Sequence, residues 1–446
     1  MNVLFVSLGC DKNLVDSERM LGILKDKGYE FTDEAEDADV IVVNSCCFIG
    51  DAKEESINTI LELGAYRIDP GERCKALIVT GCLAQRYADE IRSEIPEVDA
   101  VIGTTAYDSI AEVLEKVLGG EYVRDIKDID RVIEPKTDRI ITTGGYYSYL
   151  KIAEGCDKHC TYCIIPGLRG HYRSVPTGEL VKEARMLVSN GVKELILVAQ
   201  EITLYGSDLY GEKRLPDLLR ELCAIEGLEW IRLLYCYPEE ITDELIQVIK
   251  DEPKVCHYLD MPIQHASDDV LKRMGRKTDS RAIRAVIEKL RREIPDIAIR
   301  TTLISGFPGE SLKDHEILKD FVREIGFERL GVFEYSPEEG TPAAGMEGQI
   351  DDDIKASRRG EIMELQQQLA YEKAKSMTGR RMDVLIEGRL VEEDVYTGRT
   401  YMDAPDVDGM VFVKSDRELL SGDIVSVYIT GADNYDLIGE LDDEPA

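Results

Sequence analysis

The 446-residue chain has few basic residues, a single tryptophan and no long apolar segment. Its 54 Lys and Arg stand against 88 Asp and Glu, which gives a net charge of −34. Nucleic-acid binding depends largely on basic side chains that neutralise phosphates, so this balance argues against a nucleic-acid ligand and favours a basic partner, or reflects solubility alone. No run approaches the 18 or more apolar residues of a membrane-spanning helix. With 43% apolar residues, the chain can still bury two to four domain cores.

The first ten residues are apolar but lack a basic leader. They predict a first β-strand and not a secretory signal. We therefore expect a cytoplasmic protein that does not contact a membrane. In that compartment the eleven cysteines stay reduced, so metal binding or catalysis is a better interpretation of them than disulfide formation.

The most specific motif is a C-x3-C-x2-C loop formed by Cys156, Cys160 and Cys163. Three thiolates on one loop can hold an iron–sulfur cluster, whereas the ferredoxin spacings supply four cysteines. One iron is then left without a protein ligand, and an open coordination position is typical of a catalytic metal site. The alternative is a zinc site that uses His159 or a distant fourth ligand.

Residues 1–118 alternate short apolar runs with amphipathic helical patterns, which predicts an α/β domain with a parallel sheet. The expected strands are residues 3–8, 39–44, 76–80 and 98–102. Cys10, Cys46 and Cys82 each fall just after one of these runs. Because the carboxyl ends of parallel strands line one crevice, these cysteines should converge, although 36 residues separate each from the next. They predict a second three-thiolate site or, alternatively, buried packing cysteines.

Residues 119–145 carry charge runs between glycine pairs and predict a linker with some strand. Residues 146–375 contain six more strand–helix units, too few for an eight-fold barrel, and predict a partial (β/α)6 barrel. The site of such a barrel lies at the C-terminal ends of its strands, where Cys156 is expected. Other polar or glycine residues near the strands are candidates for cofactor binding, although each could equally be a loop or turn device: Gln200, Glu201, Gln264, Arg300 and Gly306.

Residues 376–446 change to short alternating strands with glycine at the turns. This pattern predicts a small all-β barrel. From residue 380 onward the chain has 6 basic and 17 acidic residues, a local charge of −11. The end module is therefore acidic in its own right.

These motifs resemble those of the radical S-adenosylmethionine (SAM) methylthiotransferase family along essentially the whole chain. Beside the C-x3-C-x2-C loop, the matching segments are residues 9–18, 44–49, 81–86, 258–267 and 306–310. Within the family, residues 398–409 resemble the RimO type, whose members modify an aspartate of small-subunit ribosomal protein S-twelve. Two positions depart from the pattern: Cys47 stands where the family often has Gly, and Glu201 where this type often has Asp.

The resemblance implies an N-terminal methylthiotransferase domain at 1–118, a radical SAM core at 146–375 and a TRAM β-barrel at 376–446. It implies two 4Fe-4S clusters and SAM as cofactors, and no catalytic residue beyond the cluster ligands. The implied ligands are Cys156, Cys160 and Cys163 for one cluster and Cys10, Cys46 and Cys82 for the other. The residues implied to help bind SAM are Gln200, Glu201, Gln264, Arg300 and Gly306.

The implied reaction places a methylthio group on the β-carbon of an aspartate. Its C–H bond is neither polar nor acidic, so a cofactor-derived radical must remove the hydrogen. The implied partners are the basic protein S-twelve, free or on the small subunit, an electron donor and a sulfur donor, without nucleic acid or membrane. A tRNA adenosine methylthiotransferase of the same family is the near alternative, but the acidic barrel and its loop with Asp406 and Asp408 argue against it. A non-enzymatic iron–sulfur electron carrier and a small-molecule sulfur-insertion enzyme are more distant alternatives.

Overall fold

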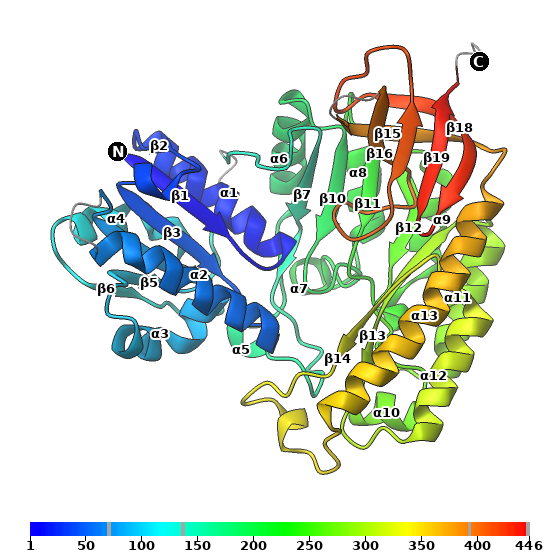
Figure 1. The fold of residues 1–446 in the computed structure, drawn as a ribbon, viewed down its shortest axis with the longest axis horizontal. Helices are drawn as coiled ribbons and strands as arrows, with labels where there is room; N and C mark the ends of the chain where they lie inside the picture. Colours follow the sequence, from blue (N-terminus) through cyan, green and yellow to red (C-terminus); the bar gives the residue numbers. More distant parts are fainter. Residues whose placement is uncertain (69–72, 135–138, 391–393, 443–446) are drawn as a thin grey trace. The chain divides into compact units, whose positions relative to one another are not determined.

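The computed structural model describes residues 1–68, 73–134, 139–390 and 394–442 (Figure 1). Residues 135–138 of the expected linker and 391–393 and 443–446 of the expected barrel lie outside the described residues. The chain forms two compact units, each made of separate segments. The first comprises Met1–Thr142, Lys151–Glu179 and Ser336–Ala344; the second comprises Thr143–Leu150, Leu180–Tyr335 and Gly345–Ala446. The loop with Cys156 thus belongs to the same unit as the N-terminal sheet.

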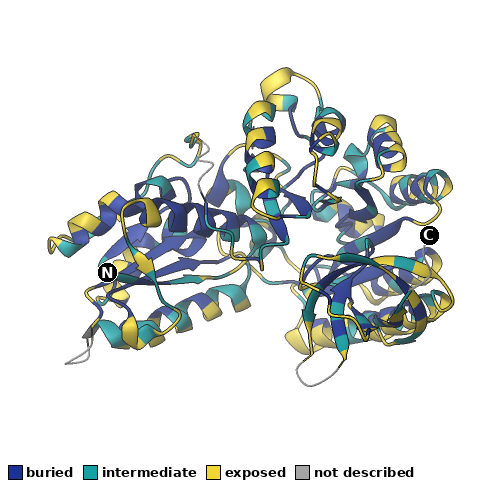
Figure 2. Cartoon of the chain, turned by 90° about the horizontal axis from the view of Figure 1, so that it is seen from above, coloured by how far each residue is buried: buried dark blue, intermediate teal, exposed yellow. Residues whose placement is uncertain are grey.

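The first unit contains a six-stranded parallel sheet in the order β2-β1-β3-β4-β5-β6. Its strands are β1 (Asn2–Ser7), β2 (Glu30–Phe31), β3 (Val40–Ser45), β4 (Ala76–Gly81), β5 (Ala100–Ile102) and β6 (Val123–Asp125). Its main helices are α1 (Asp11–Asp26), α2 (Gly50–Ile68), α3 (Cys82–Glu94) and α4 (Ile110–Leu118). Every residue of β3 and β4 is buried (Figure 2), as expected for central parallel strands that are covered on both faces.

The predicted N-terminal α/β fold is confirmed, and the four expected strands are present with ends shifted by one or two residues. One edge strand, β2, was not expected. It has only two residues, and β6 lies in the segment expected to be a linker with some strand and adds a sixth strand to the sheet. Both are too short to show a clear alternation of apolar and polar residues.

The second unit contains a six-stranded sheet in the order β14-β13-β12-β11-β10-β7, which confirms the predicted partial barrel. The strands are β7 (Tyr147–Lys151), β10 (Glu194–Val198), β11 (Trp230–Leu233), β12 (Val255–Asp260), β13 (Ala298–Ser305) and β14 (Arg329–Glu334). The main helices between them are α6 (Thr177–Ser189), α8 (Leu215–Cys223), α9 (Asp243–Asp251), α11 (Ser280–Glu293) and α12 (Leu312–Ile325). The pairs from β10 to β14 are parallel, and the sheet stays open with β14 and β7 at its edges.

Helix α13 (Asp352–Ser376) leads into a closed five-stranded barrel in the order β15-β16-β17-β19-β18, which confirms the predicted all-β module. Its strands are β15 (Arg381–Arg389), β16 (Val395–Arg399), β17 (Val411–Lys414), β18 (Ile424–Asp433) and β19 (Asp436–Leu441). Alternate apolar side chains fill its interior, as the two-residue period of strands requires. None of the helices among the described residues combines the length and apolar character needed to cross a bilayer.

Buried ion pairs hold the barrel against the open sheet within the second unit. Glu194 of β10 accepts from Arg232 Nε at 2.6 Å and from Arg399 Nη2 at 2.7 Å, and these side chains are 3% exposed or less. Although burial disfavours its charge, the two guanidinium groups hold the pKa of Glu194 below its ordinary value. A carboxylate between two arginines fixes the barrel in one orientation on the sheet, because separating them would leave buried charges unpaired.

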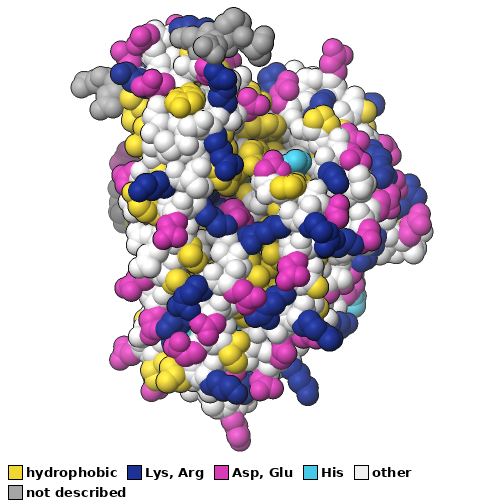
Figure 3. Space-filling view, turned by 90° about the vertical axis from the view of Figure 1, so that its right-hand side faces the viewer, with side chains coloured by type: hydrophobic (Ala, Val, Ile, Leu, Met, Phe, Trp, Pro, Cys, Tyr) yellow, Lys and Arg dark blue, Asp and Glu magenta, His cyan; other side chains and the backbone are white. Residues whose placement is uncertain are grey.

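The acidic loop with Asp406 and Asp408 is exposed only in part, because Asp406 lies at the surface and the side chain of Asp408 is buried. Asp408 does not present its charge to a partner: its side chain is 2% exposed, accepts from the Tyr258 hydroxyl at 2.7 Å and pairs with Arg300 at 3.3 Å. Asp403 is likewise buried and pairs with Arg329. On the side of the molecule that carries α11 and α13, Lys and Arg side chains are interspersed with Asp and Glu (Figure 3). On this side, therefore, the acidic residues do not form an uninterrupted negative surface.

Candidate metal centres

The first unit places the three N-terminal cysteines at one edge of its sheet. Cys10 follows β1 and precedes α1, Cys46 follows β3, and Cys82 is the first residue of α3 after β4. Strands β1, β3 and β4 are neighbours in the sheet. Gly9 has φ +86°, and a Cβ built on it would lie 2.6 Å from the Cys46 Cβ. Only a residue without a side chain permits this approach of the two strand ends.

The thiols of this N-terminal trio lie close enough to influence one another. Burial, together with the neighbouring Cys82 and Cys10, raises the pKa of Cys46 to about 12. Burial also raises the pKa of Cys82, an effect that Arg169 opposes. Such thiols are poor nucleophiles at neutral pH, but a metal that binds them displaces their protons and holds them as thiolates. The environment suits metal ligands better than a reactive cysteine.

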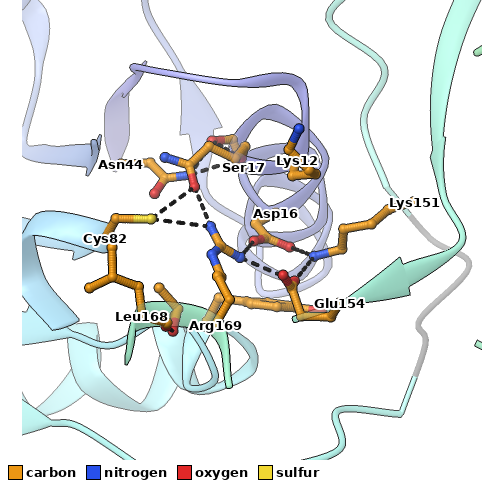
Figure 4. A network of polar contacts seen from close by, with 12 residues as sticks. Lys12, Asp16, Ser17, Asn44, Cys82, Lys151, Glu154, Leu168 and Arg169 are labelled. Carbon is orange, nitrogen blue, oxygen red and sulfur yellow. Dashed lines mark hydrogen bonds and ion pairs between the residues drawn. The ribbon is translucent and has the colours of Figure 1, made fainter. Parts of the chain in front are cut away.

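Arg169 lies at the centre of a buried polar network beside this trio (Figure 4). It ends α5 (Ile165–Arg169), and its side chain is 2% exposed. Its Nη2 lies 3.6 Å from Cys82 Sγ and donates to Asn13 Oδ1. Its Nη1 donates to Asp16 Oδ2 at 2.8 Å and to Glu154 Oε2 at 3.1 Å. One guanidinium group thus joins α1, the start of α3 and the strand that precedes the core cysteines.

Lys151 completes the charge balance of this network. Its Nζ pairs with Asp16 and lies 2.8 Å from Glu154 Oε2, and its side chain is 4% exposed. Two buried cations therefore face two carboxylates. Sequence reasoning missed this network, because its members come from distant segments. The available signal was the polar residues on the buried face of α1, such as Asn13 and Asp16.

The core trio lies on a single loop of the same unit. Cys156 follows β8 (Ala153–Glu154), and Cys163 N donates to Cys160 O at 3.0 Å just before α5. Gly155 has φ +79°, and a Cβ built on it would lie 2.0 Å from the carbonyl oxygen of His171, so no larger residue fits there. Burial, together with the other two thiols, raises the pKa of Cys163 to about 12.

The geometry of the two trios can be compared with that of a zinc site. A tetrahedral zinc ion with Zn–S bonds of about 2.3 Å brings its sulfurs to about 3.8 Å from one another. Among the described residues, no group of three ligands that includes these cysteines lies within 4.8 Å. A cubane cluster holds its thiolates farther apart, because each thiolate binds a different iron. The all-cysteine donor set suits an iron–sulfur cluster, and the assignment of a cluster to each trio stays a prediction.

Three of the predicted SAM-binding residues lie at strand ends of the second unit. Gln200 and Glu201 follow β10, and Glu201 is fully buried and accepts from the Thr203 N–H at 2.8 Å. Gln264 follows β12 with φ +70°, and its carbonyl accepts from the Ile304 N–H at 2.8 Å. These contacts order the loops, and the role of the three residues in binding SAM stays a prediction.

The other two SAM candidates belong to β13 and the loop after it. Arg300 Nη1 donates to Asp260 Oδ1 at 2.9 Å, so the guanidinium bridges this carboxylate and Asp408 of the barrel. Gly306 has φ +75° and donates its N–H to Glu310 Oε2 at 2.7 Å. A role in SAM binding stays a prediction for both residues.

Comparison with known proteins assigns the family. The model of the uncharacterized protein family UPF0004 matches residues 2–103, that of the radical SAM superfamily matches 150–322, and that of the TRAM domain matches 378–441. The chain is 64% identical over 439 residues to the ribosomal protein uS12 methylthiotransferase RimO of Lachnoclostridium phytofermentans, an alignment that covers 98% of this chain and 99% of the relative. The chain belongs to the RimO family. The RimO proteins of Acetivibrio thermocellus and Clostridioides difficile are 52% and 49% identical to it and align over 98% and 99% of both chains.

Solved structures of other radical SAM enzymes share the fold. TsrM of Kitasatospora setae, a methyltransferase solved with cobalamin and a [4Fe-4S] cluster, has a TM-score of 0.54 and 13% identity, covering 85% of this chain and 76% of its own. OxsB, solved with aqua-cobalamin and SAM, has a TM-score of 0.53 and 14% identity, covering 83% and 56%. At these identities the likeness shows the fold alone. As a member of the RimO family, the chain is a radical SAM methylthiotransferase.

Proposed function

We propose that the protein replaces a hydrogen on the β-carbon of an aspartate of ribosomal protein uS12 with a methylthio group. The proposal rests on the family and, above all, on one feature of the first unit. Two trios of cysteines, each one ligand short of a full cluster, belong to that unit, and Arg169 joins Cys82 of one trio to Glu154, two residues before Cys156 of the other. In this assignment residues 1–118 and 146–375 supply one trio each, and residues 376–446 form the end module.

The core trio would hold a 4Fe-4S cluster that leaves one iron open for SAM, and the N-terminal trio a second cluster. When bound, the first supplies the reductive cleavage of SAM that allows a hydrogen to be removed from an unactivated carbon, and the second supplies a place for the sulfur to be transferred. The protein itself positions the cofactors and shields them from competing reactions. The positive φ of Gly155 and of His159 turns the backbone of one short loop, which supports the proposal that its three thiolates hold one cluster.

The chain must also balance the charge of six thiolates in buried surroundings. Asp16 and Glu154 add two negative charges to the Arg169 network, and Arg169 and Lys151 offset them. SAM carries a cationic sulfonium and a carboxylate, and the proposed contacts are Gln200, Glu201, Gln264, Arg300 and Gly306. Among these, the carboxylate of Glu201 is buried and suits a positively charged or hydroxyl group of the ligand.

The proposed substrate follows from the named activity of the relatives and from charge. A chain of −34 attracts a basic partner, and complementary charge speeds the encounter of two proteins. An electron donor for the first cluster and a sulfur donor for the second are required as further partners, and a ribosomal substrate places the reaction in the cytoplasm. The family assignment favours this protein substrate over the tRNA alternative.

The proposal is tested by mass spectrometry of uS12 from cells that contain or lack the gene. We expect one aspartate to carry the added mass of a methylthio group, to lose it on deletion and to regain it with the wild-type gene. Cys82→Ala should fail to restore it. Cys223→Ala, which changes a cysteine of α8 outside both trios, is the matched control and should restore it. An unmodified uS12 in cells with an active gene, or modification of tRNA instead, would contradict the proposal.

A further inference from the structure

The N-terminal trio takes part of its surroundings from the segment that carries the core trio. Arg169 follows the C-x3-C-x2-C loop in sequence, yet its side chain reaches Cys82, the third N-terminal cysteine, at 3.6 Å. Arg169 is among the largest fully buried side chains of the protein. A buried guanidinium group in contact with a cysteine sulfur is a costly arrangement unless several partners compensate it.

Those partners use both arms of the guanidinium group. The arm that ends in Nη2 contacts Cys82 and Asn13, and the arm that ends in Nη1 contacts Asp16 and Glu154. The fork of Arg is planar and rigid, so contacts on one arm fix the direction of the other. The carboxylates of Asp16 and Glu154 therefore aim the Nη2 group at the Cys82 sulfur.

The same contacts connect the two cysteine sites. Glu154 lies two residues before Cys156, at the end of β8, and it shares Arg169 with Cys82. Asp16 and Asn13 belong to α1, which begins directly after Cys10. The network thus touches the segments that hold Cys10, Cys82 and Cys156.

We propose that Arg169 is a positioning residue for the N-terminal cluster: it orients the Cys82 thiolate and, through its charge and its N–H···S contact, raises the midpoint potential of the cluster that this thiolate binds. The inference deepens the proposed function and rests on it, since it requires a cluster on the N-terminal trio. Hydrogen bonds and positive charge near cluster sulfurs stabilise the more reduced, more negative state. Because Arg169 belongs to α5, the surroundings of the N-terminal cluster are complete only when α5 packs against the start of α3.

The test measures the N-terminal cluster alone. In full-length protein with Cys156, Cys160 and Cys163 replaced by Ala, only the N-terminal trio can bind a cluster. Arg169→Met and Arg169→Lys are introduced into this parent, which is reconstituted anaerobically with iron and sulfide. Iron content, the electron paramagnetic resonance spectrum after reduction and the midpoint potential from a redox titration are then compared.

We expect Arg169→Met to lower the ratio of reduced to oxidised cluster at a fixed potential about tenfold, which is a shift of about 59 mV to lower potential for a one-electron couple. Its resonance spectrum should also change, because the Cys82 thiolate loses its donor. Arg169→Lys should fall between the parent and Arg169→Met, since Lys keeps the charge but cannot contact all partners at once. A purely structural role would lower iron content without this graded shift in potential.

Two controls separate the effect on the cluster from a general effect on folding. Arg19 is a buried arginine of α1, the helix that carries Asn13 and Asp16; it is 4% exposed and donates to the Tyr107 hydroxyl at 3.1 Å. Arg19→Lys should leave the potential and the spectrum of the N-terminal cluster unchanged. The second control is a parent in which Cys10, Cys46 and Cys82 are replaced by Ala, so that only the core trio can bind a cluster. In this parent Arg169→Met should shift the midpoint potential of the core cluster by less than it shifts that of the N-terminal cluster.

The outcomes distinguish this inference from the function on which it rests. If the parent with an intact N-terminal trio binds no cluster, the proposed function fails, and the role of Arg169 fails with it. If the parent binds a cluster whose potential and spectrum are the same with Arg, Lys and Met at position 169, only the role of Arg169 is overturned. If Arg169→Met does not fold, Arg169→Lys decides: a lowered potential supports the role and an unchanged one overturns it.

Discussion

In the N-terminal trio each cysteine follows a different strand, whereas the three core cysteines lie within residues 156–163. The first arrangement depends on the register of β1, β3 and β4, whose ends are aligned by the pairs Ser7–Asn44 and Ser45–Gly81. The second depends on the backbone of one loop. Equal numbers of ligands are thus obtained from long-range pairing in one case and from local turn geometry in the other.

The two arrangements share one backbone feature. A glycine with positive φ stands directly before Cys10, Cys82 and Cys156. At Gly81 a Cβ would lie 2.3 Å from Asn44 Oδ1, a group of the neighbouring strand, and at Gly155 it would meet the backbone of Gly170 and His171, just after α5. Changes to the sheet should therefore affect the N-terminal trio alone, and changes to the loop should affect the core trio first.

The largest effects are expected from the ligands themselves. Cys82→Ala should abolish methylthiolation and lower bound iron to one cluster, while 5′-deoxyadenosine is still formed from SAM in some measure. Cys160→Ala should abolish both the product and the cleavage of SAM. Product mass spectrometry, iron analysis and chromatography of 5′-deoxyadenosine check both variants. Full methylthiolation by Cys82→Ala would remove the distinction between the two trios.

The next effect separates backbone strain from crowding at the N-terminal site. Gly9 and Gly28 have nearly equal φ, +86° and +84°, but a Cβ on Gly28 meets nothing within 4 Å, whereas on Gly9 it meets Cys46. Gly28→Ala should therefore lower the unfolding free energy only by the cost of placing alanine in a left-handed conformation, about 1–2 kcal/mol. Gly9→Ala should cost more, because Cys46 must also move.

Urea unfolding and iron content are the measurements for this pair. Gly9→Ala should lose iron from the N-terminal trio and keep the core cluster, while Gly28→Ala should keep both. Equal iron loss in the two variants would mean that the close approach of Gly9 and Cys46 does not shape the site.

Sequence patterns predicted the strand-end cysteines well, because apolar runs followed by Gly-Cys or Ser-Cys reveal both the strand and its end. They could not predict Arg169 at the N-terminal trio, since Asp16, Cys82, Glu154 and Arg169 meet only in the folded chain. For a related reason, sequence patterns gave no sign that the side chain of Asp408 is buried. A carboxylate in an acidic segment looks solvent-exposed, and only the fold brings Arg300 to it.

A smaller effect is expected from Asn13, which supports two of the strand-end turns. Its Nδ2 donates to Leu8 O at 3.1 Å and to Ser45 O at 3.0 Å, the carbonyls that precede the turns to Cys10 and Cys46. Asn13→Ala leaves both carbonyls without this donor and should cost about 1–3 kcal/mol. Iron in the N-terminal cluster should fall partly and the core cluster should remain. Unchanged stability and iron content would show that the sheet alone sets the turns.

The smallest effect concerns the opposite end of β3, far along the strand from Cys46. Asp39 accepts from Arg73 at 3.0 Å, from the Asn2 N–H at 2.9 Å and from Lys75 at 3.3 Å. Hydrogen bonds from Arg73 hold the pKa of Asp39 below its ordinary value. Since the unfolded carboxyl titrates near pH 4, this contribution to stability is complete above about pH 4 and is lost as the pH falls through the lower folded pKa.

Asp39→Asn should therefore lower the unfolding free energy by roughly 0.5–1 kcal/mol at pH 7, because Arg73 and Lys75 are about half exposed and screened by water. The difference from wild type should shrink as the pH is lowered below 4, and both clusters should stay bound at pH 7, since the cysteines lie at the other end of the strands. Asp89→Asn, which removes a carboxylate paired with Arg124 at 3.2 Å and 83% exposed, is the matched control and should show no such pH dependence. Loss of the N-terminal cluster in Asp39→Asn would mean that the trio responds to the stability of the whole sheet, and not only to the register of its strand ends.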